Sequence, residues 1–94
     1  MTIRSFKDRL GPVLFDGQRP KGFPPDLVAV ARRKLRALDA AVSVSDLTKP
    51  PGNRLEKLRG NRAGQWSIRI NDQWRVCFVW TGDGAHDVEV VDYH

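Results

Sequence analysis

Residues 55–75 read LEKLRGNRAGQWSIRINDQWR, and the rest of the chain can be understood outward from this stretch. Apolar and polar residues alternate over 66–70 and again from Trp74 onward, as in strands that turn one face toward a core. Four arginines lie within the stretch: Arg59, Arg62, Arg69 and Arg75. A sheet would hold such side chains in fixed positions facing one ligand, and guanidinium groups suit the phosphates of a nucleic-acid backbone.

The second half of the chain is a series of strand patterns separated by short turns. The strands are expected at about 54–58, 66–70, 74–80 and 87–91. Connections this short favour antiparallel neighbours. Every second residue of the third strand is expected in the core, namely Trp74, Val76, Phe78 and Trp80. The alternation therefore predicts that Arg75 lies on the opposite, open face, with Arg69 of the neighbouring strand beside it.

A helix is predicted from Pro24-Pro25-Asp26 to about Ala41. Proline is tolerated and an acid is favoured in a first helical turn, where backbone N–H groups have no partner. Apolar residues then recur at helical spacing along one face: Leu27, Ala31, Leu35, Leu38 and Val42. The other faces carry Arg32, Arg33, Lys34 and Arg36. This basic surface is either an RNA or ribosome contact or the solvated side of an amphipathic helix.

Proline marks both ends of the helical half. Ser5 and Asp8 resemble a capping pair, so a short helix is expected after them, which Pro12 should kink or end before Phe15. The run KPPGN at 49–53 forbids regular helix and strand, so it separates the helical half from the sheet half. The predicted fold is a single α+β domain over residues 1–94, with N-terminal helices packed on one face of a curled antiparallel sheet.

The composition is basic and poor in cysteine. The 94 residues include 16 Lys plus Arg against 11 Asp plus Glu, a formal net charge of +5, which favours an anionic partner and nucleic acid first. Cys77 is the single cysteine, so a disulfide framework and a cysteine-based metal site are excluded. His86 lies beside Asp87 without further ligands, so no metal and no cofactor is expected. No signal-like segment or long apolar run is present, so we expect a cytoplasmic protein without a membrane segment.

Three segments carry a resemblance to a known family. They are SFKDRL (5–10), PPGNRLEKLRGNRAGQWSIRINDQWRVCF (50–78) and VDYH (91–94), in that order over nearly the whole chain. Together they resemble the HigB toxins of the RelE/ParE superfamily. The resemblance implies a bacterial type II toxin with a RelE/ParE-like fold that enters the ribosomal A site and cuts mRNA there. It also implies a HigA-like antitoxin with a helix-turn-helix domain, which silences the toxin and represses their operon with it by binding operator DNA.

The resemblance also implies a set of working residues. Carried over position by position, the catalytic set contains Arg59, Arg75, Asp92, Tyr93 and His94. Where the family has a histidine, this chain has Glu56. Contacts with RNA or the ribosome are expected from Lys57, Arg62 and Arg69, and from Arg32, Arg33 and Arg36 on the helix.

The chemistry of RNA cleavage independently requires residues of these types. Attack by the 2′-OH needs a base to accept its proton, an acid to protonate the leaving oxygen, and fixed cations to stabilise the charged transition state. Glu56 and His94 are candidates for base and acid, and Glu56 is alternatively a group that orients Arg59 or Arg75. The two arginines would hold the scissile phosphate. Tyr93 would stack on a base, and Asp92 would fix the tautomer of His94 or hold the end of the chain.

Two rival functions fit the same resemblance. ParE toxins share the fold but poison DNA gyrase by binding, and they generally lack the Tyr-His pair found here at Tyr93 and His94. A second rival is a co-repressor module that holds an antitoxin on DNA and has little activity of its own, which the glutamate at Glu56 favours. A helix-turn-helix reading frame directly downstream would favour HigB over ParE.

Overall fold

The computed structural model describes residues 2–93, so the predictions made for His94 lie outside the described residues. The helical half contains α1 (Leu10–Phe15), η1 (Pro25–Leu27), α2 (Val28–Ala40), η2 (Val44–Thr48) and η3 (Pro51–Asn53). The sheet half contains β1 (Glu56–Lys57), η4 (Gly60–Arg62), β2 (Gln65–Arg69), β3 (Trp74–Thr81) and β4 (Gly84–Asp92). The break at the proline run is therefore confirmed.

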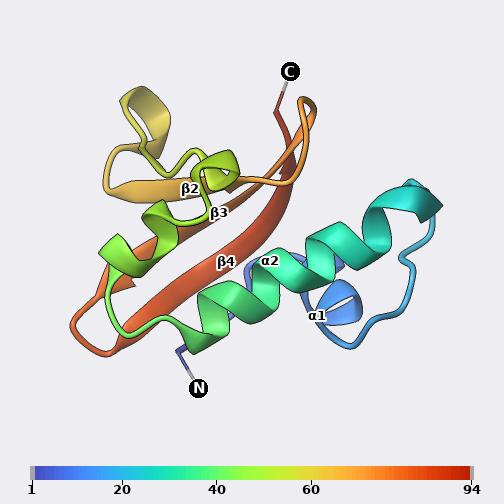
Figure 1. Ribbon diagram of the computed structural model, residues 1–94, viewed down its shortest axis with the longest axis horizontal. Helices are drawn as coiled ribbons and strands as arrows, with labels where there is room; N and C mark the ends of the chain where they lie inside the picture. Colours follow the sequence, from blue (N-terminus) through green and yellow to red (C-terminus); the bar gives the residue numbers. More distant parts are fainter. Residues whose placement is uncertain (1, 94) are drawn as a thin grey trace.

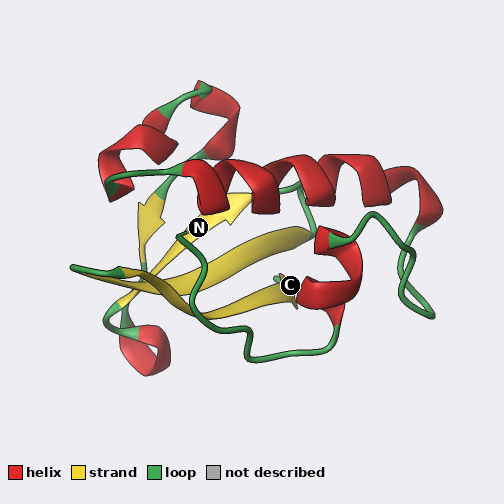
Figure 2. Ribbon diagram, turned by 90° about the horizontal axis from the view of Figure 1, so that it is seen from below, coloured by secondary structure: helices red, strands yellow, loops and turns green. Residues whose placement is uncertain are grey.

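The strands form one antiparallel sheet in the order β1-β2-β3-β4 (Figure 1). The N-terminal segment runs along the β4 edge, where Ile3 and Phe6 form isolated parallel bridges to Ala85 and Val88. Helix α2 crosses one face of the sheet, and η4 lies on the other side (Figure 2). The predicted α+β architecture, with helices on one face of an antiparallel sheet, is confirmed.

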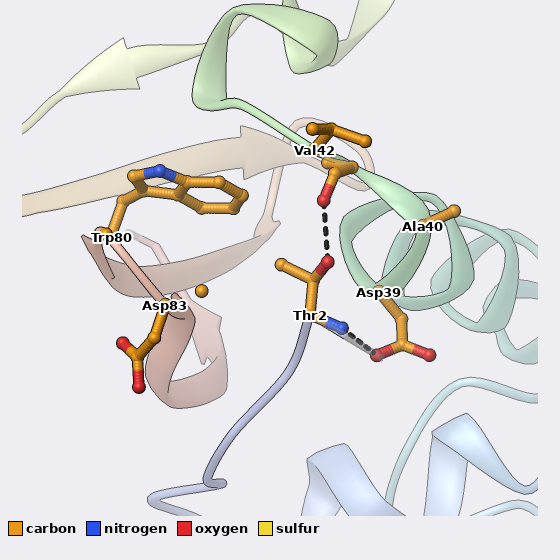
Figure 3. Close-up of a pocket in the computed structure, with 9 residues that line it drawn as sticks. Thr2, Asp39, Ala40, Val42, Trp80 and Asp83 are labelled. Carbon is orange, nitrogen blue, oxygen red and sulfur yellow. Dashed lines mark hydrogen bonds between the residues drawn. The ribbon is translucent and has the colours of Figure 1, made fainter.

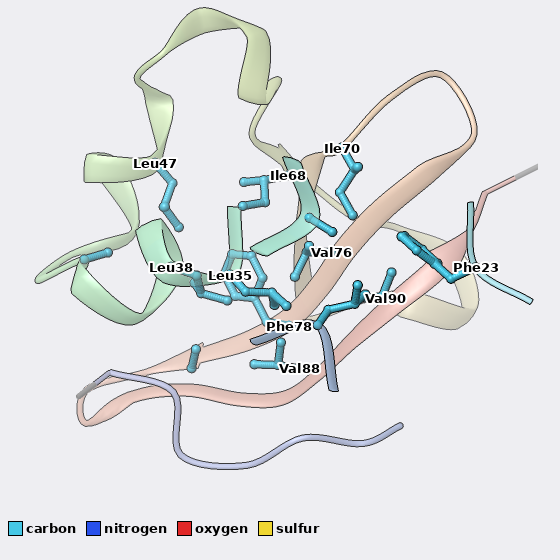
Figure 4. Packing of buried hydrophobic residues seen from close by; sticks show 14 residues of the cluster. Phe23, Leu35, Leu38, Leu47, Ile68, Ile70, Val76, Phe78, Val88 and Val90 are labelled. Atoms are coloured by element: carbon cyan, nitrogen blue, oxygen red, sulfur yellow. The ribbon is translucent and has the colours of Figure 1, made fainter. Parts of the chain in front are cut away.

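The core lies between α2 and the sheet (Figure 4). Leu35 and Leu38 of α2 are fully buried, as are Val76 and Phe78 of β3, in agreement with the helical and strand periodicities. The prediction for Val42 is wrong, because its side chain is 91% exposed. The helix ends at Ala40 and Ala41 is extended (φ −69°, ψ 138°), so helical spacing no longer decides where the next side chain points.

The first helix begins later and continues further than predicted. Helix α1 begins at Leu10 and includes both Pro12 and Phe15. Pro12 lies in the first turn, where its missing N–H costs no helical hydrogen bond, so it does not end the helix. Asp8 accepts a hydrogen bond from the Gly11 backbone N–H, whereas the Ser5 hydroxyl accepts one from the Asp87 N–H on β4. The two residues therefore do not form a capping pair.

Asn53 anchors the junction between the helical half and the sheet half. Its fully buried side chain donates from Nδ2 to the backbone oxygens of Leu47 (3.2 Å) and Lys49 (3.1 Å). Its Oδ1 accepts a hydrogen bond from Nζ of Lys34 on α2. Burial lowers the pKa of Lys34, and the charge of Arg33 lowers that pKa further. One amide therefore ties η2 and η3 to α2 directly before the sheet begins.

Replacing Asn53 with alanine should lower the free energy of unfolding by about 2–3 kcal/mol, because two buried carbonyls and an ammonium group lose their partner. Urea unfolding of the variant beside Asn61→Ala checks this, since Asn61 is exposed in η4. Equal midpoints for the two variants would show that Asn53 does not anchor the junction.

Candidate active site

The face of the sheet away from α2 brings five of the twelve predicted site residues together: Glu56, Arg62, Arg69, Arg75 and Tyr93. Directly opposite residues of an antiparallel sheet share a face, so the registers define rows across it. One row runs from Glu56 through Ser67 and Cys77 to Glu89. The next row contains Arg69, Arg75 and Val91. We call this surface the open face.

Arg75 lies at the centre of the open face and is held by three groups. Its Nη1 donates to Ser67 Oγ at 2.8 Å and to the backbone oxygen of Arg54 at 3.3 Å. Its Nη2 lies 3.6 Å from Oε2 of Glu56. The Arg75 side chain is only 15% exposed, and the Glu56 side chain is 56% exposed. The guanidinium is therefore fixed by buried and backbone groups on one side and neutralised by an exposed carboxylate on the other.

Tyr93 joins Arg75 on the open face. The Cζ atom of Arg75 lies 5.6 Å from the centre of the Tyr93 ring, a cation–π distance. The Tyr93 N–H donates to the backbone oxygen of Gln73 at 2.6 Å, which continues the pairing of β4 with β3. Tyr93 as a residue is 40% exposed, so part of it is open to solvent. Arg75 and Tyr93, two of the predicted site residues, therefore lie side by side.

Asp92 lies on a different side of the strand from Tyr93. It is the register partner of Trp74, whose ring packs toward the core against Phe23 at 4.9 Å between ring centres. Its Oδ2 accepts a hydrogen bond from Nε2 of Gln73 at 3.0 Å. Gln73 therefore contacts the end of β4 through both its side chain and its backbone oxygen, a role that the sequence patterns did not reveal.

An ion pair bridges another part of the open face. Arg62, in η4, donates from Nη1 to Glu89 Oε1 on β4 at 2.7 Å and to Gln65 Oε1 at 3.1 Å. The hydrogen bond to Glu89 raises the pKa of Arg62. Cys77 is fully buried in the same row as Glu89. Burial raises the pKa of its thiol, although the charge of Arg62 opposes this shift, so Cys77 is a neutral packing residue.

The other basic residues of the sheet half differ in their surroundings. Arg69 forms an ion pair with Asp72. Arg59 is exposed at the start of η4. Lys57 is the register partner of Trp66, and its Nζ lies 5.7 Å from the centre of that ring, on the side of the sheet that faces α2. Lys57 therefore does not share the open face with Arg75.

The arginines of α2 form a separate basic surface. Arg32, Arg33 and Arg36 line a hollow of about 330 Å³ together with Ala29. Arg36 donates to the backbone oxygen of Phe15 at 3.1 Å, and its Cζ lies 4.0 Å from the centre of the Phe15 ring. Because α2 covers the other face of the sheet, this surface and the open face cannot contact the same phosphate.

The rest of the described chain offers little competing chemistry. Residues 2–93 contain no group of three His, Cys, Asp or Glu side chains placed to bind a metal ion, and the His86 ring forms a hydrogen bond with Asp83 at 2.8 Å. No helix in this part of the chain is long and apolar enough to cross a bilayer. A second hollow of about 450 Å³ lies where Thr2, Val42 and Trp80 meet, and it contains none of the predicted site residues (Figure 3).

Comparisons with known proteins agree with the fold. Residues 4–94 match the family described as the RelE-like toxin of type II toxin–antitoxin system HigB. Toxin HigB-1 of Vibrio cholerae is 43% identical over 90 residues, which cover 95% of this chain and 94% of that protein. Endoribonuclease HigB of Proteus vulgaris is 32% identical over 92 residues, which cover 98% and 99% of the two chains.

A solved structure supports the fold independently. The YoeB–YefM complex from Staphylococcus aureus matches with a TM-score of 0.62 and 16% identity, covering 100% of this chain and 99% of that one. At this identity the likeness concerns the fold alone. The family match over residues 4–94, together with the two relatives, shows that the chain belongs to the HigB-like toxins, the RelE-like toxins of type II toxin–antitoxin systems.

Proposed function

We propose that this chain is a ribosome-dependent endoribonuclease that cuts mRNA in the ribosomal A site and thereby stops translation. The name of the Proteus vulgaris relative, Endoribonuclease HigB, supports RNA cleavage as the activity. The proposal rests on the groups around Arg75. Ser67 and Arg54 fix its guanidinium, and the exposed Glu56 carboxylate and the Tyr93 ring lie beside it. A fixed cation beside these groups suits a phosphate flanked by an unstacked base.

The reaction assigns a role to each group. Arg75, together with Arg59, holds the scissile phosphate and stabilises the charge that develops on it. Tyr93 stacks on a neighbouring base. Glu56 accepts the 2′-OH proton, and His94 protonates the leaving 5′ oxygen. Asp92 holds the end of β4 through Gln73, so that Tyr93 stays beside Arg75.

Replacing Glu56 with glutamine should slow single-turnover cleavage by about 10- to 100-fold. This is the low end of what a positioned general base contributes, because solvent reaches the Glu56 carboxylate. Quench-flow cleavage of ribosome-bound mRNA measures this rate, and Glu89→Gln tests whether any carboxylate of the open face has the same effect. An unchanged rate in the Glu56 variant would leave Glu56 only the role of counter-ion to Arg75.

The decisive experiment maps new mRNA 5′ ends in a translation reaction, with and without ribosomes, for the wild type and Arg75→Ala. New ends in phase with codons, present only with ribosomes and only for the wild type, are the expected result. Intact mRNA during active translation would contradict the nuclease, and inhibition of DNA supercoiling would then test the gyrase alternative. Intact mRNA together with unaffected supercoiling would favour a co-repressor.

We also propose that a HigA-like antitoxin binds this chain in the cytoplasm, and that the complex represses its own operator DNA. Membership of a type II toxin–antitoxin family supports an antitoxin partner. A toxin of net charge +5 calls for acidic groups on that partner. The surface of Arg32, Arg33 and Arg36 lies on the α2 side, so we assign it to contacts with ribosomal RNA. We assign the open face, with Arg62 and Arg69, to contacts with the mRNA.

A further inference from the structure

We infer that Ser67 is a positioning residue for Arg75, the group that keeps its guanidinium aimed at the phosphate when substrate displaces Glu56. The inference rests on the proposed role of Arg75 in RNA cleavage. Ser67 lies in the middle of β2, and its side chain is fully buried on the open face. Its hydroxyl accepts a 2.8 Å hydrogen bond from Nη1 of Arg75.

The hydroxyl has a specific reason to lie there. Burying a hydroxyl without a hydrogen-bond partner is unfavourable, and Arg75 is the one side-chain partner of Ser67 within residues 2–93. Its register partner Cys77 is equally buried and neutral, so packing alone would accept a small apolar side chain at this position. The polar atom of Ser67 therefore serves Arg75 rather than the core.

Ser67 and Glu56 hold different nitrogens of Arg75. Glu56 approaches Nη2 at 3.6 Å and is more than half exposed, so a phosphate can take its place. The fully buried Ser67 hydroxyl and the Arg54 oxygen hold Nη1 instead. When the carboxylate leaves, these two acceptors keep the guanidinium plane in place. Without the hydroxyl, only the weaker 3.3 Å hydrogen bond to the Arg54 oxygen would still hold Nη1 of Arg75. The guanidinium plane would then be free to turn as the phosphate binds.

The test compares Ser67→Ala with Cys77→Ala, its matched control. Both variants remove a small buried side chain at directly opposed positions of the open face. The first readout is the rotation rate about the Cζ–Nε bond of Arg75, measured by NMR on arginine side chains and assigned from the signal that Arg75→Ala lacks. The second readout is single-turnover cleavage of ribosome-bound mRNA over a range of toxin concentrations.

In Ser67→Ala we expect faster rotation of the Arg75 side chain and a roughly 10- to 100-fold lower maximal cleavage rate, at an unchanged half-saturating toxin concentration. Cys77→Ala should match the wild type in both readouts. Equal effects of the two variants, or a full rate and slow rotation in Ser67→Ala, would overturn the inference. If wild-type protein does not cut mRNA but Ser67→Ala still frees the rotation, the proposed function fails while the restraint of Arg75 by Ser67 stands.

Discussion

Replacing Arg75 with alanine should abolish growth arrest and slow mRNA cleavage by about 100- to 1,000-fold, while the protein stays folded and bound to its antitoxin. The side chain contributes little to the apolar core, because it lies on the open face and its contacts are polar groups and the ring of Tyr93. What the variant loses is the cation in a low-dielectric setting, where a charge stabilises a developing anion most strongly. The rate constant of cleavage on programmed ribosomes is the measurement.

Two further variants make the Arg75 result specific. Arg4→Ala removes an equal charge at the β3–β4 turn, where its Nε contacts the Asp83 backbone oxygen at 2.7 Å, and it should keep full activity. Arg75→Lys keeps the charge but loses the planar set of donors that reaches Ser67, Arg54 and a phosphate together, so it should stay close to the alanine variant. A folded Arg75→Ala protein that still arrests growth would remove Arg75 from the site.

The position of Arg75 and Tyr93 on one face of the sheet is predictable from strand periodicity alone. Alternation along 74–80 places Arg75 opposite the core residues, and the same rule applied to β4 places Tyr93 two residues beyond Val91 on that face. Burial enforces both assignments, since a shift of one residue would expose Val76 and Phe78 and bury Arg75. This part of the site is predictable because one face of the sheet must pack against α2.

The groups that hold the arginines were not predictable in the same way. Ser67 lies beside Arg75 only because β2 and β3 pair with Ile68 opposite Val76, a register that the patterns leave open by a residue or two. The pair of Arg62 and Glu89 joins residues 27 positions apart across the sheet. Lys57 is expected to contact RNA or the ribosome, and its alternation with Glu56 places it on the face of the sheet opposite to Glu56. Individual contacts depend on strand register and on how η4 folds over the sheet. Neither can be predicted from the spacing of apolar and polar residues in the sequence.

Removing His94 alone should slow cleavage by roughly 100- to 10,000-fold, the range that a positioned acid or base contributes, without lowering the melting temperature. Two described interactions hold this end of the chain and do not involve His94: Asp92 pairs with Trp74, and the Tyr93 N–H donates to the Gln73 oxygen. Both interactions survive the deletion. Single-turnover cleavage and thermal unfolding of the same preparation separate a chemical role of the imidazole from a structural one.

Because the deletion places a carboxylate on Tyr93 beside Arg75, His94→Ala is needed as a second variant with the original chain length. Free imidazole added to His94→Ala should restore part of the rate, since it supplies the lost proton donor and acceptor without altering the protein. His86→Ala is the matched control, because His86 contacts Asp83 at the opposite end of β4 and lies away from Arg75. Full activity of both His94 variants would move the proton transfer to another group, whereas partial rescue by imidazole in His94→Ala alone would place it beside Arg75.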